Sequence, residues 1–129
     1  MDRDALYDSD DLLEVVNDQM TLHAEVQGHR VRVRVGGEVD VATEPALRAF
    51  ILSAVTREIT EQVIDLSAVT FLDSSGMRGL VLASREAAAA GVAFSLLCPE
   101  LNTAVTKVLE ILKINSMMTV VTTDSCQPG

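Results

Sequence analysis

Hydrophobic and polar positions alternate in two stretches near the start of the chain. MTLHAEV and RVRVRV place an apolar side chain at every second position, and Gln27-Gly28-His29 lies between them. A period of two is typical of a strand with one buried face, and a short connection containing Gly joins such strands into a hairpin. The pattern therefore predicts a β-hairpin here.

Apolar residues recur at helical spacing in three later stretches. The alternation stops at GGEVDVAT, and Pro45 just beyond it suits the first turn of a helix. A second helix is predicted from about Ser74 to Ala90, where Gly91 closes it. PELNTAVTKVLEILKI is the third. The apolar faces comprise Leu47, Phe50, Ile51 and Ala54 in the first helix and Leu101, Val105, Val108, Leu109 and Leu112 in the third.

Three short apolar runs, QVIDLS, VAFSLLC and MMTVVTT, read as strands. The first lacks clean alternation, as expected for a strand covered on both sides. Strands that alternate with helices after an opening hairpin imply a mixed sheet with helices packed on it. A chain of 129 residues is the size of one domain. We therefore expect a single α/β domain with about five strands and three or four helices.

The first eighteen residues differ from the rest in composition. They hold seven acidic groups and one basic group, which is −6 of the formal net charge of −9. The stretch ALYDSDDLLEVVND could be a short helix that docks an apolar stripe or a mobile acidic arm, and we favour a partial helix. We divide the chain into an acidic extension (1–18), a domain (19–122) and a short tail (123–129).

Composition narrows the classes of function. An acidic domain repels phosphate backbones, which argues against direct nucleic-acid binding. No apolar run approaches the ~20 residues of a membrane span, and no basic start precedes a long apolar stretch. Cys98 and Cys126 make neither a disulfide framework nor a metal site. We expect a cytoplasmic protein without metal or cofactor, as a monomer or weak homodimer.

The stretch FLDSSGMRG, residues 71–79, carries the candidate chemistry. Asp73 and Ser74 lie where a helix should begin, and Asp and Ser are preferred there because they accept hydrogen bonds from unpaired backbone N–H groups. A serine nucleophile would need a general base within reach. The two histidines, His23 and His29, belong to the opening hairpin, so we reject a hydrolase.

A phosphoacceptor aspartate, as in response-regulator receivers, is a second possibility. It needs an acidic pair at a strand end, but Asp10-Asp11 lies in the leading segment. It also needs a lysine near a late strand, whereas Lys107 and Lys113 lie in the last helix. We reject this interpretation too. The third possibility is a serine phosphorylated by a separate kinase, because a helix N-terminus tolerates phosphate well.

Three segments in order, GGEVDVAT, VIDLSAVTFLDSSGMRGL and LLCPELNTAVTKVLEI, resemble an anti-sigma factor antagonist of the bacterial STAS domain family. The resemblance covers roughly residues 19–122. It implies that the unphosphorylated protein binds an anti-sigma factor and so frees a sigma factor for transcription. The anti-sigma factor of such systems is commonly also an ATP-dependent serine kinase, and a separate phosphatase resets the switch.

The resemblance also implies roles for individual residues. Ser74 corresponds to the phosphorylated serine, and Ser75 occupies a position held by Ser or Thr. Asp40 corresponds to an acidic residue near the acceptor, Asp73 to the one that precedes it, and Gly76 completes the motif. The alternatives are a STAS module of a larger signalling assembly or a nucleotide-sensing STAS domain without direct sigma control. We expect no catalysis by the chain itself.

Helical geometry suggests a surface for a partner. At about 100° per residue, the side that should face the sheet holds Met77, Leu80, Val81, Ser84, Ala87 and Ala88. Leu82 points roughly the other way, near Ser75, Gly79 and Glu86. Our candidate partner-binding residues are Met77, Arg78, Gly79 and Leu82.

Two other features are open at this point. Arg30, Arg32 and Arg34 alternate with valines, as on the solvated face of an outer strand or in a basic row that attracts an acidic partner or the acidic arm. The chain departs from the family pattern because only a short tail follows the last strand, where the family usually has a helix. We expect the leading segment to pack where that helix would lie or to mediate self-association.

Overall fold

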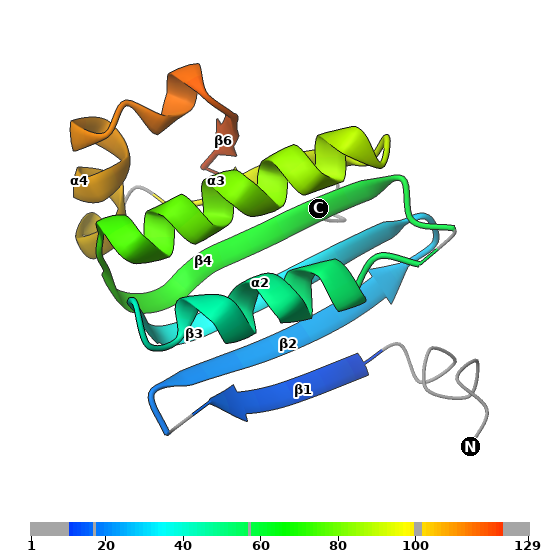
Figure 1. Ribbon diagram of the computed structural model, residues 1–129, viewed down its shortest axis with the longest axis horizontal. Helices are drawn as coiled ribbons and strands as arrows, with labels where there is room; N and C mark the ends of the chain where they lie inside the picture. Colours follow the sequence, from blue (N-terminus) through cyan, green and yellow to red (C-terminus); the bar gives the residue numbers. More distant parts are fainter. Residues whose placement is uncertain (1–10, 17, 57, 100–101, 123–129) are drawn as a thin grey trace.

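The protein is built on one mixed six-stranded sheet (Figure 1). The computed structural model describes residues 11–16, 18–56, 58–99 and 102–122, with only the backbone for 11–16 and Asn115. The strands are β1 (Asp11–Val16), β2 (Met20–Gln27), β3 (Arg30–Val39), β4 (Glu61–Leu72), β5 (Ala93–Leu97) and β6 (Thr119–Val121). The helices are α2 (Glu44–Ser53), α3 (Ser74–Ala89), α4 (Thr103–Ile111) and a 3₁₀ turn, η1 (Ile114–Ser116). Leu101, Cys126 and the tail 123–129 lie outside the described residues.

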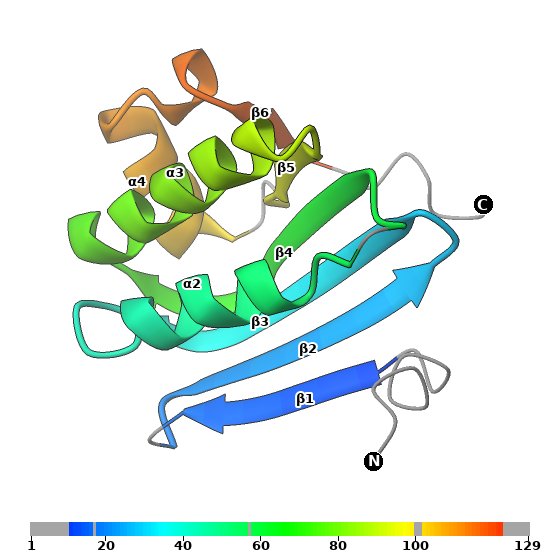
Figure 2. The ribbon, with the colours of Figure 1, turned by 45° about the vertical axis from the view of Figure 1, so that its right-hand side comes forward.

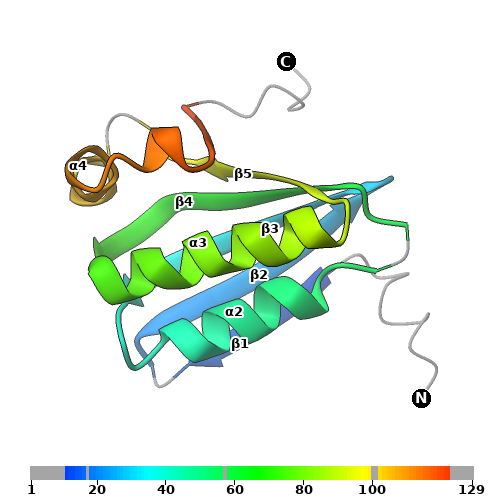
Figure 3. The same ribbon diagram turned by 45° about the horizontal axis from the view of Figure 1, so that its top comes forward.

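The strands follow one another across the sheet in chain order. The β1–β2 and β2–β3 pairs are antiparallel, and the β3–β4, β4–β5 and β5–β6 pairs are parallel. Figure 3 shows α2 and α3 side by side on one face of the sheet. In Figure 2, α4 lies beyond α3 at one end. The predicted α/β fold with a mixed sheet is confirmed.

The local signals in the sequence correspond to the observed elements. The predicted hairpin is β2–β3, joined by a two-residue turn in which Gly28 has φ +64°. The first predicted helix is α2, with Pro45 in its first turn and Leu47, Phe50 and Ile51 buried. Gly91, at φ +76°, follows the end of α3. Each of these signals lies within a few residues of the element boundary that it marks.

The apolar face of α3 is rotated from the side that periodicity predicts. The residues of α3 that are buried are Gly76, Met77, Gly79, Leu80, Ala83 and Ala87. Ala88 is exposed, whereas Gly79 was expected on the outer side. A Cβ atom at Gly79 would collide with Cγ of Glu44 in α2, so α2 lies directly against this position. The helix therefore packs on two neighbours, the sheet and α2, and its buried arc is shifted toward α2.

The partial helix in the leading segment was wrong for the residues that are described. Asp11–Val16 form β1, which pairs with β2 in register from Asp11↔Glu25 to Val16↔Met20. Residues 1–10 lie outside the described residues. The strand lies at the edge of the sheet opposite β6, so these six residues extend the sheet and do not take the place of a helix after β6.

The arginine row does not lie on an outer strand. β3 lies between β2 and β4, and its arginines face acidic residues of β4. Arg32 Nη2 donates a 2.7 Å hydrogen bond to Asp65 Oδ2, Arg34 Nε lies 3.6 Å from the same oxygen, and Arg30 Nε lies 3.5 Å from Glu61 Oε1. The row is thus an internal ion-paired network on the face opposite α2 and α3.

The core contains mainly Val, Leu, Ile and Ala, as expected for a chain in which only 3% of the residues are aromatic. Cys98, just after β5, belongs to it, and burial raises the pKa of its thiol to about 11. Asn102 attaches the start of α4 to β4, because its Nδ2 donates to the carbonyl oxygens of Leu66 and Val69, each at 2.9 Å. These bonds therefore attach α4 to the second half of β4.

Candidate functional site

The candidate site lies where two parallel strands end side by side. The parallel pairing of β3 and β4 ends at Val39↔Leu72, and the backbone N–H of Asp73 donates to the carbonyl of Val39 at 3.3 Å. Asp40 and Asp73 therefore emerge from neighbouring strands at the same edge of the sheet. The sequence placed these two residues in one site, and the structure brings their backbones together.

Asp73 begins α3. Its extended backbone, with φ −107° and ψ −176°, leaves Oδ1 free to accept a 2.9 Å hydrogen bond from the N–H of Gly76. The carbonyl of Asp73 accepts the N–H of Met77 at 3.0 Å. This is the side-chain cap that the Asp-Ser-Ser spacing predicts, and it satisfies one of the unpaired N–H groups of the first turn.

Gly76 allows the first turn of α3 to approach the end of β3. A Cβ atom here would lie 2.7 Å from both Cγ1 and the carbonyl oxygen of Val39 and 2.9 Å from Cδ1 of Leu72. Real Cβ atoms do not approach other atoms this closely, so the site requires a residue without a side chain. The glycine thereby fixes how far Ser74 stands from β3.

Asp40 forms a hydrogen-bonded turn between β3 and α2. Its Oδ1 accepts the N–H groups of Ala42 at 2.9 Å and Thr43 at 3.1 Å. The buried hydroxyl of Thr43 donates to the carbonyl of Glu38 at 3.0 Å. These bonds hold the loop rigidly and engage one oxygen of the Asp40 carboxylate with backbone donors.

Ser74 is the first residue of α3, and its side chain is exposed. Ser75 is half-buried. The two serines therefore differ in access: an enzyme can reach the hydroxyl of Ser74 more easily. Asp73 engages its carboxylate in the cap, so the charged group next to Ser74 is directed toward the backbone.

The four candidate partner-binding residues divide into two pairs. Met77 is 1% exposed and Gly79 is buried against Glu44, so neither offers a side chain to a partner. Arg78 is exposed and Leu82 is half-buried. The expectation that Gly79 lies on the outer face is thus corrected, because α2 covers it.

Two exposed apolar side chains near Ser74 were not found from the sequence. Val41, in the loop after β3, is 71% exposed, and Phe71, the second-last residue of β4, is 48% exposed. Phe71 is paired with Glu38 across the sheet, so both residues lie at the edge that carries Asp40 and Asp73. In the sequence, the only indication of this exposed surface was Val41, an apolar residue directly after Asp40 in GEVDV.

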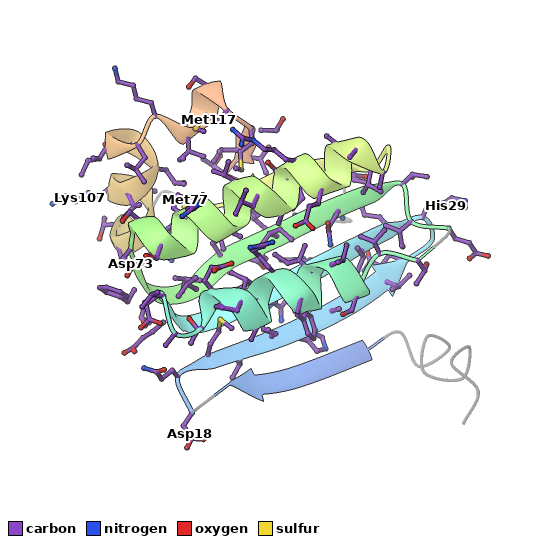
Figure 4. All side chains as sticks on the ribbon, in the orientation of Figure 1. Asp18, His29, Asp73, Met77, Lys107 and Met117 are labelled. Atoms are coloured by element: carbon purple, nitrogen blue, oxygen red, sulfur yellow. The ribbon has the colours of Figure 1, made fainter. Side chains whose placement is uncertain are left out.

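The arrangement offers Ser74 no general base from the two histidines. Figure 4 shows His29 at the opposite end of the sheet from Asp73, and Nδ1 of His29 lies 2.8 Å from the carbonyl oxygen of Glu58. His23 lies within β2.

Among residues 11–16, 18–56, 58–99 and 102–122, no three His, Cys, Asp or Glu side chains gather as a metal site. Within the same ranges, no helix is both long and apolar enough to cross a membrane.

Comparison with protein families defines the class of the molecule. The STAS domain family matches residues 21–125, which is most of the chain. The chain belongs to the STAS domain family.

Several solved structures are similar to this chain. An anti-sigma factor antagonist from Mycobacterium paratuberculosis is 25% identical with a TM-score of 0.70, and the match covers 85% of this chain and 92% of that one. The Bacillus cell fate determinant SpoIIAA in its phosphorylated form is 25% identical with a TM-score of 0.55, covering 87% and 91%. A putative anti-sigma factor antagonist from Thermotoga maritima shares the fold at 17% identity and a TM-score of 0.62, covering 89% and 88%. Comparison with curated protein sequences gave no significant match.

Proposed function

We propose that this chain is an anti-sigma factor antagonist whose binding to an anti-sigma factor is switched by phosphorylation of Ser74. The observation that carries the proposal is the exposed Ser74 hydroxyl at the capped start of α3, within the residues that the STAS domain family matches. Two structurally similar proteins support it: one is an anti-sigma factor antagonist, and the other, SpoIIAA, has been solved in a phosphorylated form.

The chemistry requires little of this chain. A partner kinase transfers the γ-phosphoryl group of ATP to Oγ of Ser74, and ADP and the hydroxyl proton leave. A phosphatase then hydrolyses the phosphate ester and restores the hydroxyl. The role of this chain is to present Ser74, and the cap at Asp73 and the close contact at Gly76 hold that residue in place.

Phosphorylation acts on a partner surface and leaves the fold in place. It adds about −1.5 to −2 charges at neutral pH. Ser74 is exposed at the positive end of a helix dipole, where added negative charge is tolerated. The same charge repels an acidic partner and must be stripped of water before an apolar partner can cover it. Binding therefore falls while α3 stays folded.

The modification is tested by incubating the full chain with ATP and its kinase and measuring the intact mass. We expect the mass of one phosphoryl group to be added to the natural chain and to Ser75→Ala, and none to Ser74→Ala. Modification that survives in Ser74→Ala and disappears in Ser75→Ala would contradict the assignment. Tight nucleotide binding by the chain alone would favour the nucleotide-sensing alternative.

The partner is tested by a pull-down from cells of the source organism. We expect Ser74→Ala to retain an anti-sigma factor and Ser74→Asp to lose it, because the aspartate carries part of the charge of a phosphate. If both variants retain the same proteins, phosphorylation does not control binding.

The surface around Ser74 gives a second test. Leu82→Glu should weaken binding of the anti-sigma factor about tenfold or more, as expected when a contact in the centre of an interface is replaced by an unpaired charge, with little change in melting. Leu52→Glu is the matched control, since Leu52 is 58% exposed but lies in the last turn of α2. Equal affinities for the two variants would place the interface elsewhere.

A further inference from the structure

Arg78 is an exposed cation one helical turn after Ser74. Both residues lie on α3, at positions i and i+4, and both side chains are exposed. In the part of the chain that the structure describes, Arg78 has no hydrogen bond or ion pair. Other arginines are engaged: Arg32 binds Asp65, and Arg48 lies 3.5 Å from Glu44 and 3.8 Å from Glu86. The guanidinium of Arg78 is thus available for another partner.

Helix geometry brings the guanidinium toward Ser74. Side chains four residues apart stand one above the other on a helix surface. Each Cα–Cβ bond in a helix tilts toward the N-terminus, so a long side chain at position 78 has the reach to cover position 74. An anion at position i with a cation at i+4 is also the more favourable orientation of such pairs.

The other charged groups near Ser74 have partners or belong to other elements. The Asp73 carboxylate accepts the N–H of Gly76, and Asp40 accepts the N–H groups of its own turn. Glu38 accepts a hydrogen bond from Gln19, and Glu44 is paired with Arg48. Lys107 extends from α4 at the same end of the molecule as Asp73 (Figure 4). Arg78 and Lys107 are therefore the two cations to compare.

We propose that Arg78 binds the phosphoryl group on Ser74 and is thereby withdrawn from the surface that contacts the partner. This proposal rests on the proposed function, because it requires phosphorylated Ser74. Arginine suits the role, since its planar fork of N–H donors matches two phosphate oxygens at once. Phosphorylation then changes the surface twice: it adds negative charge, and it removes a free cation.

The proposal also defines the chemistry of the partner. In the unphosphorylated chain the exposed Arg78 is flanked by the apolar Leu82 on the same helix. A matching partner presents a carboxylate to Arg78 beside an apolar side chain. In the phosphorylated chain that carboxylate would face the phosphate and no free guanidinium.

The experiment measures the phosphate directly and needs no kinase. Phosphoserine is placed at position 74 of the full chain during translation, and the second pKa of its phosphate, ordinarily about 6, is followed by ³¹P NMR titration. We expect Arg78→Gln to raise this pKa by about 0.3 unit or more, because the dianion loses an ion pair. Arg78→Lys should keep most of the effect.

Two matched variants decide between cations. Arg85→Gln removes an exposed arginine of α3 about 16 Å along the helix from Ser74, and Lys107→Gln removes the lysine on α4. We expect Arg85→Gln to shift the pKa by less than about 0.1 unit, since exposed charges beyond a Debye length are screened. We expect Lys107→Gln to shift it less than Arg78→Gln does, because Lys107 lies on α4 and Arg78 lies one turn from Ser74 on the same helix. The proposal is overturned if Arg78→Gln leaves the pKa unchanged, or if Lys107→Gln gives the larger rise.

The other part of the proposal, that Arg78 contacts the partner before phosphorylation, is tested on the unphosphorylated chain. Arg78→Gln should bind the anti-sigma factor several-fold more weakly than Arg85→Gln. Equal binding would show that Arg78 does not contact the partner. Because phosphoserine is introduced during translation, absence of Ser74 phosphorylation by any kinase would defeat the proposed function without altering the titration result.

Discussion

At the scale of single residues, the site depends on two local requirements that one short motif meets. Asp73 satisfies an unpaired N–H group of α3, and Gly76 lets the helix approach Val39. The sequence motif therefore has a structural reason that is independent of phosphorylation. Ser74 is left with no structural task among these contacts, so its hydroxyl is available for modification.

Gly76→Ala tests the close approach. Alanine is better than glycine in a helix interior by about 1 kcal/mol, yet here its Cβ would press on Val39, and such overpacking costs about 1–3 kcal/mol. We expect a net loss of up to about 2 kcal/mol in the free energy of unfolding, measured with urea. Ser75→Ala, in the same turn, should change it by less than about 0.5 kcal/mol. A Gly76→Ala protein more stable than the natural one would show that the helix start can move.

At the scale of elements, Asp65 joins β3 to β4. It is 1% exposed, and burial of the carboxyl by itself opposes ionisation. The hydroxyl of Ser67, at 2.6 Å, the N–H of Ser67 and the guanidinium of Arg32 together outweigh burial and hold the pKa of Asp65 below its ordinary value of 3.8. The charged carboxylate is therefore the stable form within the sheet.

Asp65→Asn tests this connection through its pH dependence. Because the pKa of Asp65 is lowered on folding, its carboxylate contributes stability above pH 3.8 that is lost as the pH falls through the folded-state pKa. We expect the natural chain to exceed Asp65→Asn by about 2 kcal/mol at pH 7 in urea unfolding, and by less at pH 3. Glu61→Gln, whose partner Arg30 is 3.5 Å away and whose side chain is 41% exposed, is the control. A difference that grows at low pH would contradict this account.

The sequence predicts an element well when its signals lie within the element. Pro45 marks the start of α2, and Asp73 and Gly91 mark the two ends of α3. Periodicity alone misplaced the buried arc of α3, because the contact between Gly79 and Glu44 depends on a second helix. β1 was missed for the same kind of reason: DLLEVV has no alternation, and pairing with β2 makes it a strand.

The residues of the candidate site, too, were predicted from the sequence only where they are neighbours in the chain. The residues of one loop, Asp73 to Gly76, were identified together because they are adjacent in the chain. The exposed Val41 and Phe71 were not, because they come together only through the parallel pairing of β3 and β4. The arginine row was placed on an outer strand because nothing local shows that β4 supplies Asp65 and Glu61 as partners.

At the scale of the whole molecule, the candidate site and the edge strand β1 lie on different parts of the sheet. The end that carries Asp40, Asp73 and Ser74 is held by α2, α3 and α4, whereas β1 lies at the far edge from β6. A change at β1 can therefore alter stability or association without reaching the candidate site. The extension 1–18 and the domain 19–122 are joined at Asp11–Val16, which pair with β2.

Truncation tests the role of β1. Removing residues 1–18 exposes the edge of β2, whereas removing 1–10 leaves Asp11–Val16 in place. We expect the longer deletion to lower the melting temperature by about 5 °C or more and to promote association, since an unpaired strand edge pairs readily with another chain. Calorimetry and light scattering measure the two effects. If both truncated proteins match the full chain in melting and in mass, β1 contributes neither stability nor protection of the edge.

The buried Cys98 gives a way to observe motions of one part of the fold. Its N–H donates to the carbonyl of Val121 at 2.8 Å, so the thiol lies where the β5 end meets β6. With a pKa of about 11, only about one thiol in a thousand is ionised at pH 8, and alkylation must wait for the structure to open. After Cys126→Ser, Cys98 is the single thiol of the chain. The rate at which Cys98 is alkylated then reports how often the β5–β6 side opens. Comparing this rate in chains with serine or phosphoserine at position 74 shows whether phosphorylation changes the opening of the far side of the sheet.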